Sequence, residues 1–251
     1  MRTLFWLVYK EIAYHRAYPL DLVSLAISPF FIVAPFVFAA KAYPENVQVG
    51  VATGLLVWYW FSMFFWGVGY GVRDEMEEGT LESLLATPIS LWQLLAAKAL
   101  DTMFINIYIT LFLVILLQGV AGVGIPLYRP GFGLMFGVSG FALASLSFLY
   151  AALVIAARQA AVLGSLVQEA LGILSGMTAP TSVFPRALQW CAAVIPLTYA
   201  IRGTRRVVQG QMPYFEAVIL FLFGSVLFVG GMLAIFLVER HMRKTGEVGE
   251  Y

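Results

Sequence analysis

One serine and two histidines are the side chains in this sequence that most resemble a catalytic set. Ser139 lies in a Gly-Val-Ser-Gly tetrapeptide, and a serine can act as a nucleophile when a base lies within hydrogen-bond reach. The two histidines, His15 and His241, lie near the two ends of the chain, outside its long apolar runs. One cysteine and two histidines are also too few for a zinc cluster. The sequence therefore predicts no catalytic residue and no metal site on this chain.

A carboxylate inside an apolar stretch is a second candidate. Glu169 follows Arg158 by eleven residues, which at about 1.5 Å per helical residue places it roughly 16 Å deep, near the middle of a bilayer. A charge at that depth is costly and usually faces a bundle interior or a water-filled cavity. Glu169 is thus a candidate for the translocation path. A protonated carboxyl, or one bonded to Gln168 or a nearby serine, explains it equally well.

Three arginines, Arg202, Arg205 and Arg206, follow a proline-interrupted segment and form an outer-face candidate. They would attract an anionic substrate or a lipid headgroup. The simpler interpretation is that they cap the broken segment and extend to water, as long basic side chains do near a membrane interface. The sequence leaves both roles open.

The most polar stretch of the chain, residues 73–90, has the pattern of a short helix in an aqueous loop. Its acidic residues are Asp74, Glu75, Glu77, Glu78 and Glu82. Gly79 and Thr80 supply a bend and a helix N-cap. Glu82 then falls in the first turn, where the helix dipole favours a negative charge.

An apolar face follows in the same stretch. Leu81, Leu84 and Leu85 are spaced at i, i+3 and i+4, and Pro88 ends a predicted helix of about two turns over residues 80–86. A helix this short is marginal in water, so it should pack on something else. That partner is either another protein or the membrane interface, in which case the helix is a plain amphipathic connector.

The composition around these candidates decides the class of protein. Of 251 residues, 61% are hydrophobic and 12% charged, against about 45–50% and about 25% in soluble domains. The mean hydropathy is +0.86, so the bilayer is the natural solvent for most of the chain. A formal net charge of +1 gives no field that would attract nucleic acid. We expect an all-α integral membrane protein with one transmembrane domain over residues 1–251.

Apolar runs of about 20 residues or more predict six transmembrane helices. They cover residues 20–40, 49–72, 92–120, 131–157, 160–182 and 214–238. Residues 1–18 suit an amphipathic helix lying in the membrane interface, and prolines and arginines in residues 183–213 predict an extracytoplasmic re-entrant region before the last span. Six crossings place both termini on one side, and a modest excess of Lys and Arg favours the cytoplasm for that side.

Two groups of residues carry a resemblance to a known family. The first comprises Glu78-Gly79-Thr80-Leu81-Glu82, Leu84, Leu85, Thr87-Pro88-Ile89-Ser90 and Lys98. The second comprises Ser175-Gly176, Pro180, Pro185, Pro196-Leu197-Thr198-Tyr199 and Arg202. They resemble the first cytoplasmic loop and the re-entrant region of type-2 ABC transporter permeases. Chain length, span count and the N-terminal helix agree, so the resemblance covers essentially the whole chain.

The resemblance implies that the short helix is a coupling helix that docks in a groove of a separate ABC ATPase subunit. The implied ATPase-coupling residues are Glu78, Gly79, Thr80, Leu81, Glu82, Leu84 and Leu85. We expect the leucines to supply packing and the glutamates to orient the contact. The chain has no phosphate-binding loop of the form G-x-x-x-x-G-K-S/T, so ATP and magnesium would bind to the partner, with no cofactor and no enzymatic activity on this chain.

The resemblance further implies an assembly in the plasma membrane or the bacterial or archaeal inner membrane. It would contain two permeases, either identical or paralogous, and would export an amphipathic drug, lipid or lipid-linked polysaccharide. Two other classes stay open. An ion-coupled transporter or channel would use Glu169 but leaves the acidic loop unexplained, and a rhomboid-type intramembrane serine protease would use Ser139 but needs a membrane-embedded histidine.

Overall fold

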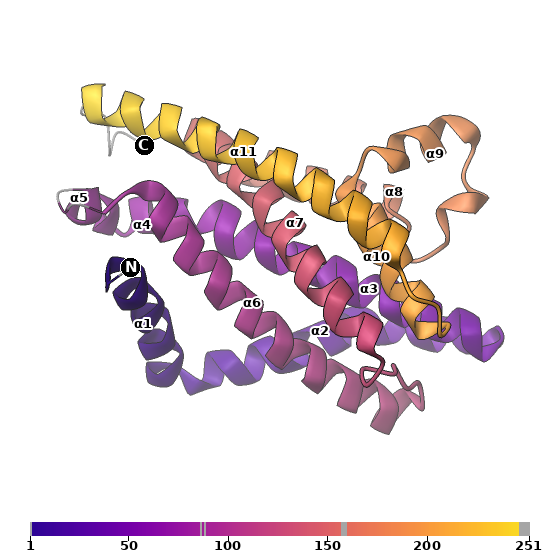
Figure 1. Ribbon diagram of the computed structural model, residues 1–251. Coiled ribbons are helices and arrows are strands. Elements are labelled where there is room, and N and C mark those ends of the chain that lie inside the picture. Colours follow the sequence, from indigo (N-terminus) through magenta and orange to yellow (C-terminus); the bar gives the residue numbers. More distant parts are fainter. Residues whose placement is uncertain (1, 86, 88, 157–159, 246–251) are drawn as a thin grey trace.

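The computed structural model describes residues 2–85, 87, 89–156 and 160–245, and every regular element in that part of the chain is a helix (Figure 1). The helices on the N-terminal side are α1 (Arg2–Ala17), α2 (Pro19–Ala39), η1 (Ala40–Ala42), α3 (Glu45–Phe64), η2 (Phe65–Tyr70), α4 (Gly71–Glu77) and α5 (Thr80–Leu85). Those that follow are α6 (Leu91–Leu116), η3 (Leu117–Ala121), α7 (Pro130–Ala156), α8 (Ala160–Leu174), η4 (Thr181–Val183), α9 (Arg186–Ala193), α10 (Pro196–Val208) and α11 (Tyr214–Thr245).

Five helical stretches in the described part of the chain are long and apolar enough to cross a membrane. They are Pro19–Ala42, Glu45–Glu77, Leu91–Ala121, Pro130–Ile155 and Tyr214–Arg243. Each coincides with one of the predicted spans. The first contains two prolines inside α2 and still forms one helix, and α1 is a separate helix that ends before Pro19, as predicted.

The second of these stretches extends beyond its predicted end at residue 72. The helix passes through the π-helical segment η2 and continues as α4 to Glu77, so the polar loop begins later than expected. Side-chain pairing explains the extension. Arg73 pairs with Glu77 across one turn at 2.7 Å, and Glu75 is buried against lysines of other helices.

α8 lies where the sequence predicts a span over residues 160–182, but it is shorter. Its 15 residues measure about 22 Å along the axis, less than the roughly 30 Å of a hydrocarbon layer. The helix ends at Leu174 because Gly176 adopts a left-handed φ of 83°, which stops an α-helix. The expected count of six spans is therefore not confirmed by the described residues.

α8 runs antiparallel to the stretch formed by α3 and η2 and contacts it through a few side chains. A Cβ on Gly164 would clash with Tyr150 of α7 and touch Phe65 of η2, and eight residues later a Cβ on Gly172 would clash with Trp58 of α3. In Figure 1 the start of α1 and the end of α11 lie at the same end of the bundle as α4 and α5, whereas α9 and α10 lie at the other end. Pro185 and Pro196 stand at the starts of α9 and α10, where a missing N–H is tolerated.

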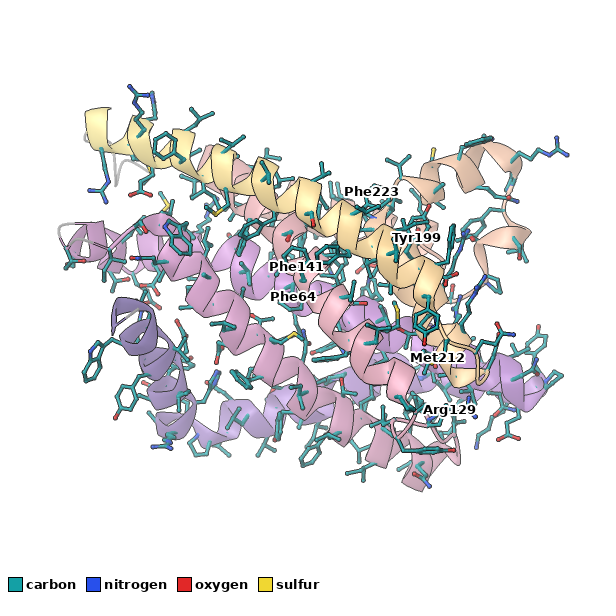
Figure 2. All side chains as sticks on the ribbon, in the orientation of Figure 1. Phe64, Arg129, Phe141, Tyr199, Met212 and Phe223 are labelled. Carbon is teal, nitrogen blue, oxygen red and sulfur yellow. The ribbon has the colours of Figure 1, made fainter. Side chains whose placement is uncertain are left out.

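The span that contains α3 forms the centre of the bundle, and α2 and α11 lie at its outside. In an 18-residue apolar window of each span, 78% of the residues are buried in the span that contains α3, against 28% in the span of α2 and 22% in the span of α11. α11 packs along α7, where Gly224 leaves room for Phe141 (Figure 2). The apolar outer faces of α2 and α11 suit contact with lipid or with another membrane subunit.

Candidate functional site

The predicted short helix of the polar loop is present as α5, which joins the end of α4 to the start of α6. It runs over Thr80–Leu85, in agreement with the prediction as far as the described residues extend, since residue 86 lies outside them. Gly79 makes the bend with a φ of 69°, and its N–H donates to the Met76 carbonyl at 3.1 Å. A Cβ at position 79 would meet nothing within 4 Å, so the backbone conformation alone favours glycine.

One side of α5 is packed onto the protein itself. Leu81 is 1% exposed and belongs to the same hydrophobic cluster as Leu91. The packing role predicted for Leu81 is therefore directed inward, because the side chain of Leu81 is buried in the hydrophobic core of the protein. Glu78 and Ser83 are exposed. The predicted coupling residues whose side chains lie outside the described part of the chain are Glu82, Leu84 and Leu85.

A buried carboxylate joins α5 to three other helices. Glu75 of α4 is 4% exposed. It accepts from Lys10 of α1 at 2.7 Å and from the Thr80 hydroxyl of α5 at 2.5 Å, and it lies 3.4 Å from Nζ of Lys98 in α6. Lys98 lies 3.7 Å from Glu11 as well. We call Lys10, Glu75, Thr80 and Lys98 the Glu75 junction.

This junction changes the role predicted for Thr80. The sequence favours a hydroxyl that caps the amides of α5, but Thr80 lies in the first turn and its hydroxyl donates to the carboxylate and the carbonyl of Glu75. The sequence pattern placed Glu75 among solvated acids. The signal that points to its burial is Lys98, a lysine within an apolar span, which needs a counter-charge. Gly71 leaves room for it, since a Cβ there would lie 3.0 Å from Cδ of Lys98.

The start of α6, just after α5, is held by the end of α11. Glu239 accepts from the N–H of Leu91 at 3.1 Å, and Arg243 donates to the Ile89 carbonyl at 3.3 Å. Arg243 also pairs with Glu239 at 2.9 Å. A carboxylate at a helix N-terminus satisfies a free amide and favours the helix dipole. We call these four residues the α6–α11 clamp.

At the opposite end of the bundle, Arg205 has a structural role. It donates to the Gly50 carbonyl at 2.9 Å and to the Met177 carbonyl at 3.1 Å, which holds α10 to α3 and to the segment after α8. Gly54 leaves room for the guanidinium. Burial lowers the pKa of Arg205 to about 10, so it stays charged near neutral pH.

The other two predicted arginines of α10 face a pocket. Arg202 is exposed and donates to the Thr181 hydroxyl at 2.5 Å. Arg206 pairs at 3.0 Å with Glu216, a buried carboxylate in the first turn of α11. All three arginines line this pocket, but Arg205 binds backbone carbonyls, whereas Arg202 and Arg206 contact side chains.

The chain matches, over residues 11–238, the family described as ABC-2 family transporter protein. This chain belongs to the ABC-2 transporter family. The resemblance to type-2 ABC transporter permeases is thereby confirmed. Two relatives, each named Inner membrane transport permease YhhJ and found in Escherichia coli (strain K12) and Shigella flexneri, are 30% identical to it over 134 residues. The match covers 53% of this chain and 36% of each relative, so the chain matches little more than a third of their length.

In this ABC-2 family protein, the translocation candidate Glu169 lies on the exposed face of α8. The preceding residue, Gln168, points the other way, where it donates to the Ser62 hydroxyl at 2.7 Å and accepts from the Trp66 indole. Gln168 therefore docks α8 on α3, and it does not bond to Glu169. Within the described part of the chain, Glu169 has no hydrogen bond or ion pair.

The arrangement around Ser139 does not favour protease chemistry. Ser139 is fully buried in α7, and its hydroxyl has no hydrogen-bond partner among the described residues, so neither histidine contacts it. His15 lies 3.1 Å from Asp101, between α1 and α6. Gly140, next to Ser139, faces Met103 of α6, as expected of a small residue at a helix contact. No group of metal-ligating side chains occurs in the part of the ABC-2 family chain that the structure describes.

Proposed function

We propose that this protein is the membrane-spanning subunit of an ABC exporter, driven by a separate ATPase that docks on the exposed side of α5. The observation that carries the proposal is the placement of α5, a six-residue helix between two long apolar spans with Glu78 and Ser83 exposed. Membership in the ABC-2 transporter family supports it. In this proposal α5 and both termini lie at the cytoplasmic end, and ATP and magnesium bind to the partner.

The charges around α5 favour a protein partner over a lipid surface. Asp74 and Glu77 of α4 and Glu78, which follows α4, are exposed. Anionic headgroups repel carboxylates, whereas a docking groove lined by basic residues would attract them and fix their orientation. We therefore expect the ATPase to present lysines or arginines around the α5 groove.

The Glu75 junction and the α6–α11 clamp together connect α5 to helices on both sides of the bundle. The Glu75 junction ties it to α1, α4 and α6, and the α6–α11 clamp ties the start of α6 to the last span. A displacement of α5 is thus passed to several spans at once. Closure of the ATPase dimer does work on the membrane subunit only if the docked helix fits differently in the two states.

The rest of the assembly follows from the surfaces that a single copy leaves uncovered. A second copy of the chain, or a paralogous permease, would cover apolar faces that are exposed here. The cargo would be an amphipathic drug, lipid or lipid-linked polysaccharide. A carboxylate on the exposed face of an embedded α8 is costly against lipid, so Glu169 would face the second subunit or a water-filled path between the two.

The proposal is tested by co-expression with ABC ATPases from the same genome, starting with any encoded in adjacent reading frames. We expect one ATPase to co-purify with the permease. Vesicles containing both should move a fluorescent amphiphile when ATP and magnesium are added, with or without a protonophore. Transport that needs no ATPase and stops when the ion gradient collapses would contradict the proposal and favour an ion-coupled transporter.

Glu169→Gln is expected to lower the transport rate at least about tenfold, which corresponds to about 1.4 kcal/mol of activation free energy, while leaving assembly with the ATPase intact, because an ionisable residue at this depth usually lines the path. Transport is measured in vesicles, and ATPase binding by co-purification. Glu45→Gln, an exposed acid in the first turn of α3, is the control. A wild-type transport rate for Glu169→Gln would remove Glu169 from the path.

A further inference from the structure

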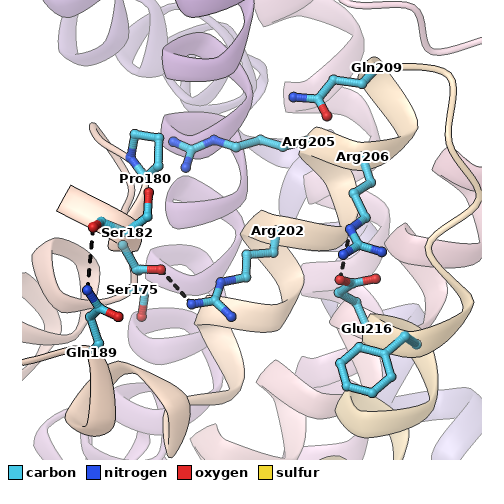
Figure 3. Close-up of a pocket in the computed structure, with 11 residues that line it drawn as sticks. Ser175, Pro180, Ser182, Gln189, Arg202, Arg205, Arg206, Gln209 and Glu216 are labelled. Atoms are coloured by element: carbon cyan, nitrogen blue, oxygen red, sulfur yellow. Dashed lines mark hydrogen bonds and ion pairs between the residues drawn. The ribbon is translucent and has the colours of Figure 1, made fainter. Parts of the chain in front are cut away.

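A pocket of about 410 Å³ opens at the end of the bundle opposite α5 (Figure 3). It lies where α10 faces the segment between α8 and α9 and the first turn of α11. Its main polar lining residues are Ser175, Thr181, Arg202, Arg206, Gln209 and Glu216. Side chains from separate segments of the chain thus converge on one space.

The pocket carries an excess of positive charge. Its ionisable lining residues are Arg202, Arg205, Arg206 and Glu216, so three guanidinium groups face one carboxylate. Arg205 is committed to backbone carbonyls, but Arg202 and Arg206 each make one side-chain contact in the described structure, to Thr181 and to Glu216. A guanidinium has five N–H donors, so both arginines keep donors for a ligand with several acceptor oxygens.

A buried hydroxyl on the segment that follows α8, which faces α10 across the pocket, also lacks a partner. Ser175 is 1% exposed and lines the pocket, and its Oγ has no hydrogen bond within the described part of the chain. A buried polar atom without a hydrogen-bond partner destabilises the fold, so most buried polar atoms in native proteins have a partner. A ligand oxygen would satisfy this hydroxyl together with the arginines.

The position of the pocket indicates the rest of the ligand. Phe215, in the first turn of the last span, lines the pocket and is 64% exposed. An aromatic ring beside arginines at the end of a span lies at the depth of lipid headgroups. A molecule that reached Phe215 with an apolar part would therefore bring its polar end to Arg202 and Arg206.

We propose that this pocket binds the phosphate-bearing headgroup of an amphipathic molecule. Arg202 and Arg206 contact the phosphate, Ser175 donates to it, and Phe215 packs on the apolar part. The headgroup belongs either to a phospholipid of the surrounding leaflet or to a transported amphiphile. Headgroup binding does not depend on the ATPase, whereas the assignment as cargo rests on the proposed export function.

The test uses the purified full-length permease in nanodiscs of phosphatidylcholine, titrated with a fluorescent short-chain phosphatidic acid. We expect saturable binding that Arg202→Ala weakens at least about tenfold, the loss that follows from removing one charge-assisted hydrogen-bonding group. The affinity of Arg202→Lys should lie between those of the wild type and Arg202→Ala, because lysine keeps the positive charge but lacks the planar guanidinium. Arg186→Ala, at an exposed arginine of α9 that does not line the pocket, is the matched control and should bind as wild type.

Thermal stability is measured on every variant. If Arg202→Ala unfolds, the double variant Arg206→Gln with Glu216→Gln serves instead, since it removes the second anion contact without leaving an unpaired buried carboxylate. It should also weaken binding about tenfold. Absence of saturable binding, or an equal loss in Arg186→Ala, would overturn the proposal.

Two further arms distinguish the sources of the headgroup. Competition by glycerol phosphate, which has no acyl chain, measures how much of the affinity comes from the phosphate alone. In vesicles that also contain the ATPase, a transported amphiphile should stimulate ATP hydrolysis at the concentration that fills the pocket, whereas a resident phospholipid should bind without stimulation. If no ATPase partner exists, binding in nanodiscs is unaffected, so the two proposals fail separately.

Discussion

A permease in which Ser83 is replaced by arginine is expected to insert into the membrane normally and to lose its ATPase partner. Ser83 is exposed on α5, on a helix whose Leu81 is packed inward. In the proposed complex the exposed side of α5 lies in a groove of the ATPase. A bulky cation there would disturb packing and repel the basic residues expected around the groove. Loss of a central interface contact typically costs 2 kcal/mol or more, so we expect affinity to fall at least about thirtyfold.

The measurement is co-purification followed by a binding titration of the ATPase to permease in nanodiscs. Gln211→Arg is the matched control, because Gln211 is exposed in the turn between α10 and α11, at the opposite end of the bundle, and the substitution adds the same charge. Unchanged ATPase affinity in Ser83→Arg would show that the exposed side of α5 is not the docking surface. An equal loss in Gln211→Arg would attribute the effect to charge alone.

Features that depend on neighbouring residues in the sequence are the ones that could be predicted. Five spans follow from run length and hydropathy, which are local properties. α5 follows from a glycine bend at Gly79, the leucine spacing and Pro88, all within ten residues. The break between α1 and α2 follows from Pro19. The apolar runs that form these helices and the glycines and prolines that end them are neighbours in the sequence.

The side chains that connect the helices could not be predicted in the same way. Glu75 is paired with a lysine 65 positions away, and Leu91 is capped by a glutamate 148 positions away. Nothing in the local pattern of the acidic stretch separates buried Glu75 from Asp74, Glu77 and Glu78, which are exposed. Leu81 illustrates the same limit, because an amphipathic spacing identifies an apolar face and leaves open which body it packs against.

The arginines of α10 show how tertiary contacts divide a cluster that the sequence treats as one. Arg205 points toward α3 and donates hydrogen bonds to two backbone carbonyls, those of Gly50 and Met177. Arg202 and Arg206 face the pocket between α8, α9 and α11. Arg205 therefore has a structural role, whereas an anion site at Arg202 and Arg206 stays a proposal.

Glu75→Gln is expected to lower the stability of the permease by about 3 kcal/mol, the lower end of the range for breaking a buried ion pair. The amide still accepts from the Thr80 hydroxyl, but Lys98 loses the closer of its two carboxylates and keeps only Glu11, at 3.7 Å. For a chain of this length such a loss lowers the melting temperature by roughly 6–12 °C. The melting temperature is measured in detergent by intrinsic fluorescence.

Glu77→Gln is the matched control, since Glu77 belongs to the same helix and also forms an ion pair, with Arg73, but is 58% exposed. A surface pair contributes about 1 kcal/mol at most, so its melting temperature should fall by no more than roughly 4 °C. Equal shifts in the melting temperatures of the two variants would contradict the role of Glu75 as a buried junction.

If the Glu75 junction also transmits motion from α5, vesicles that contain Glu75→Gln permease and the ATPase should hydrolyse ATP at an undiminished rate but transport less substrate per ATP. The reason is that α5 would then move without displacing α1 and α6.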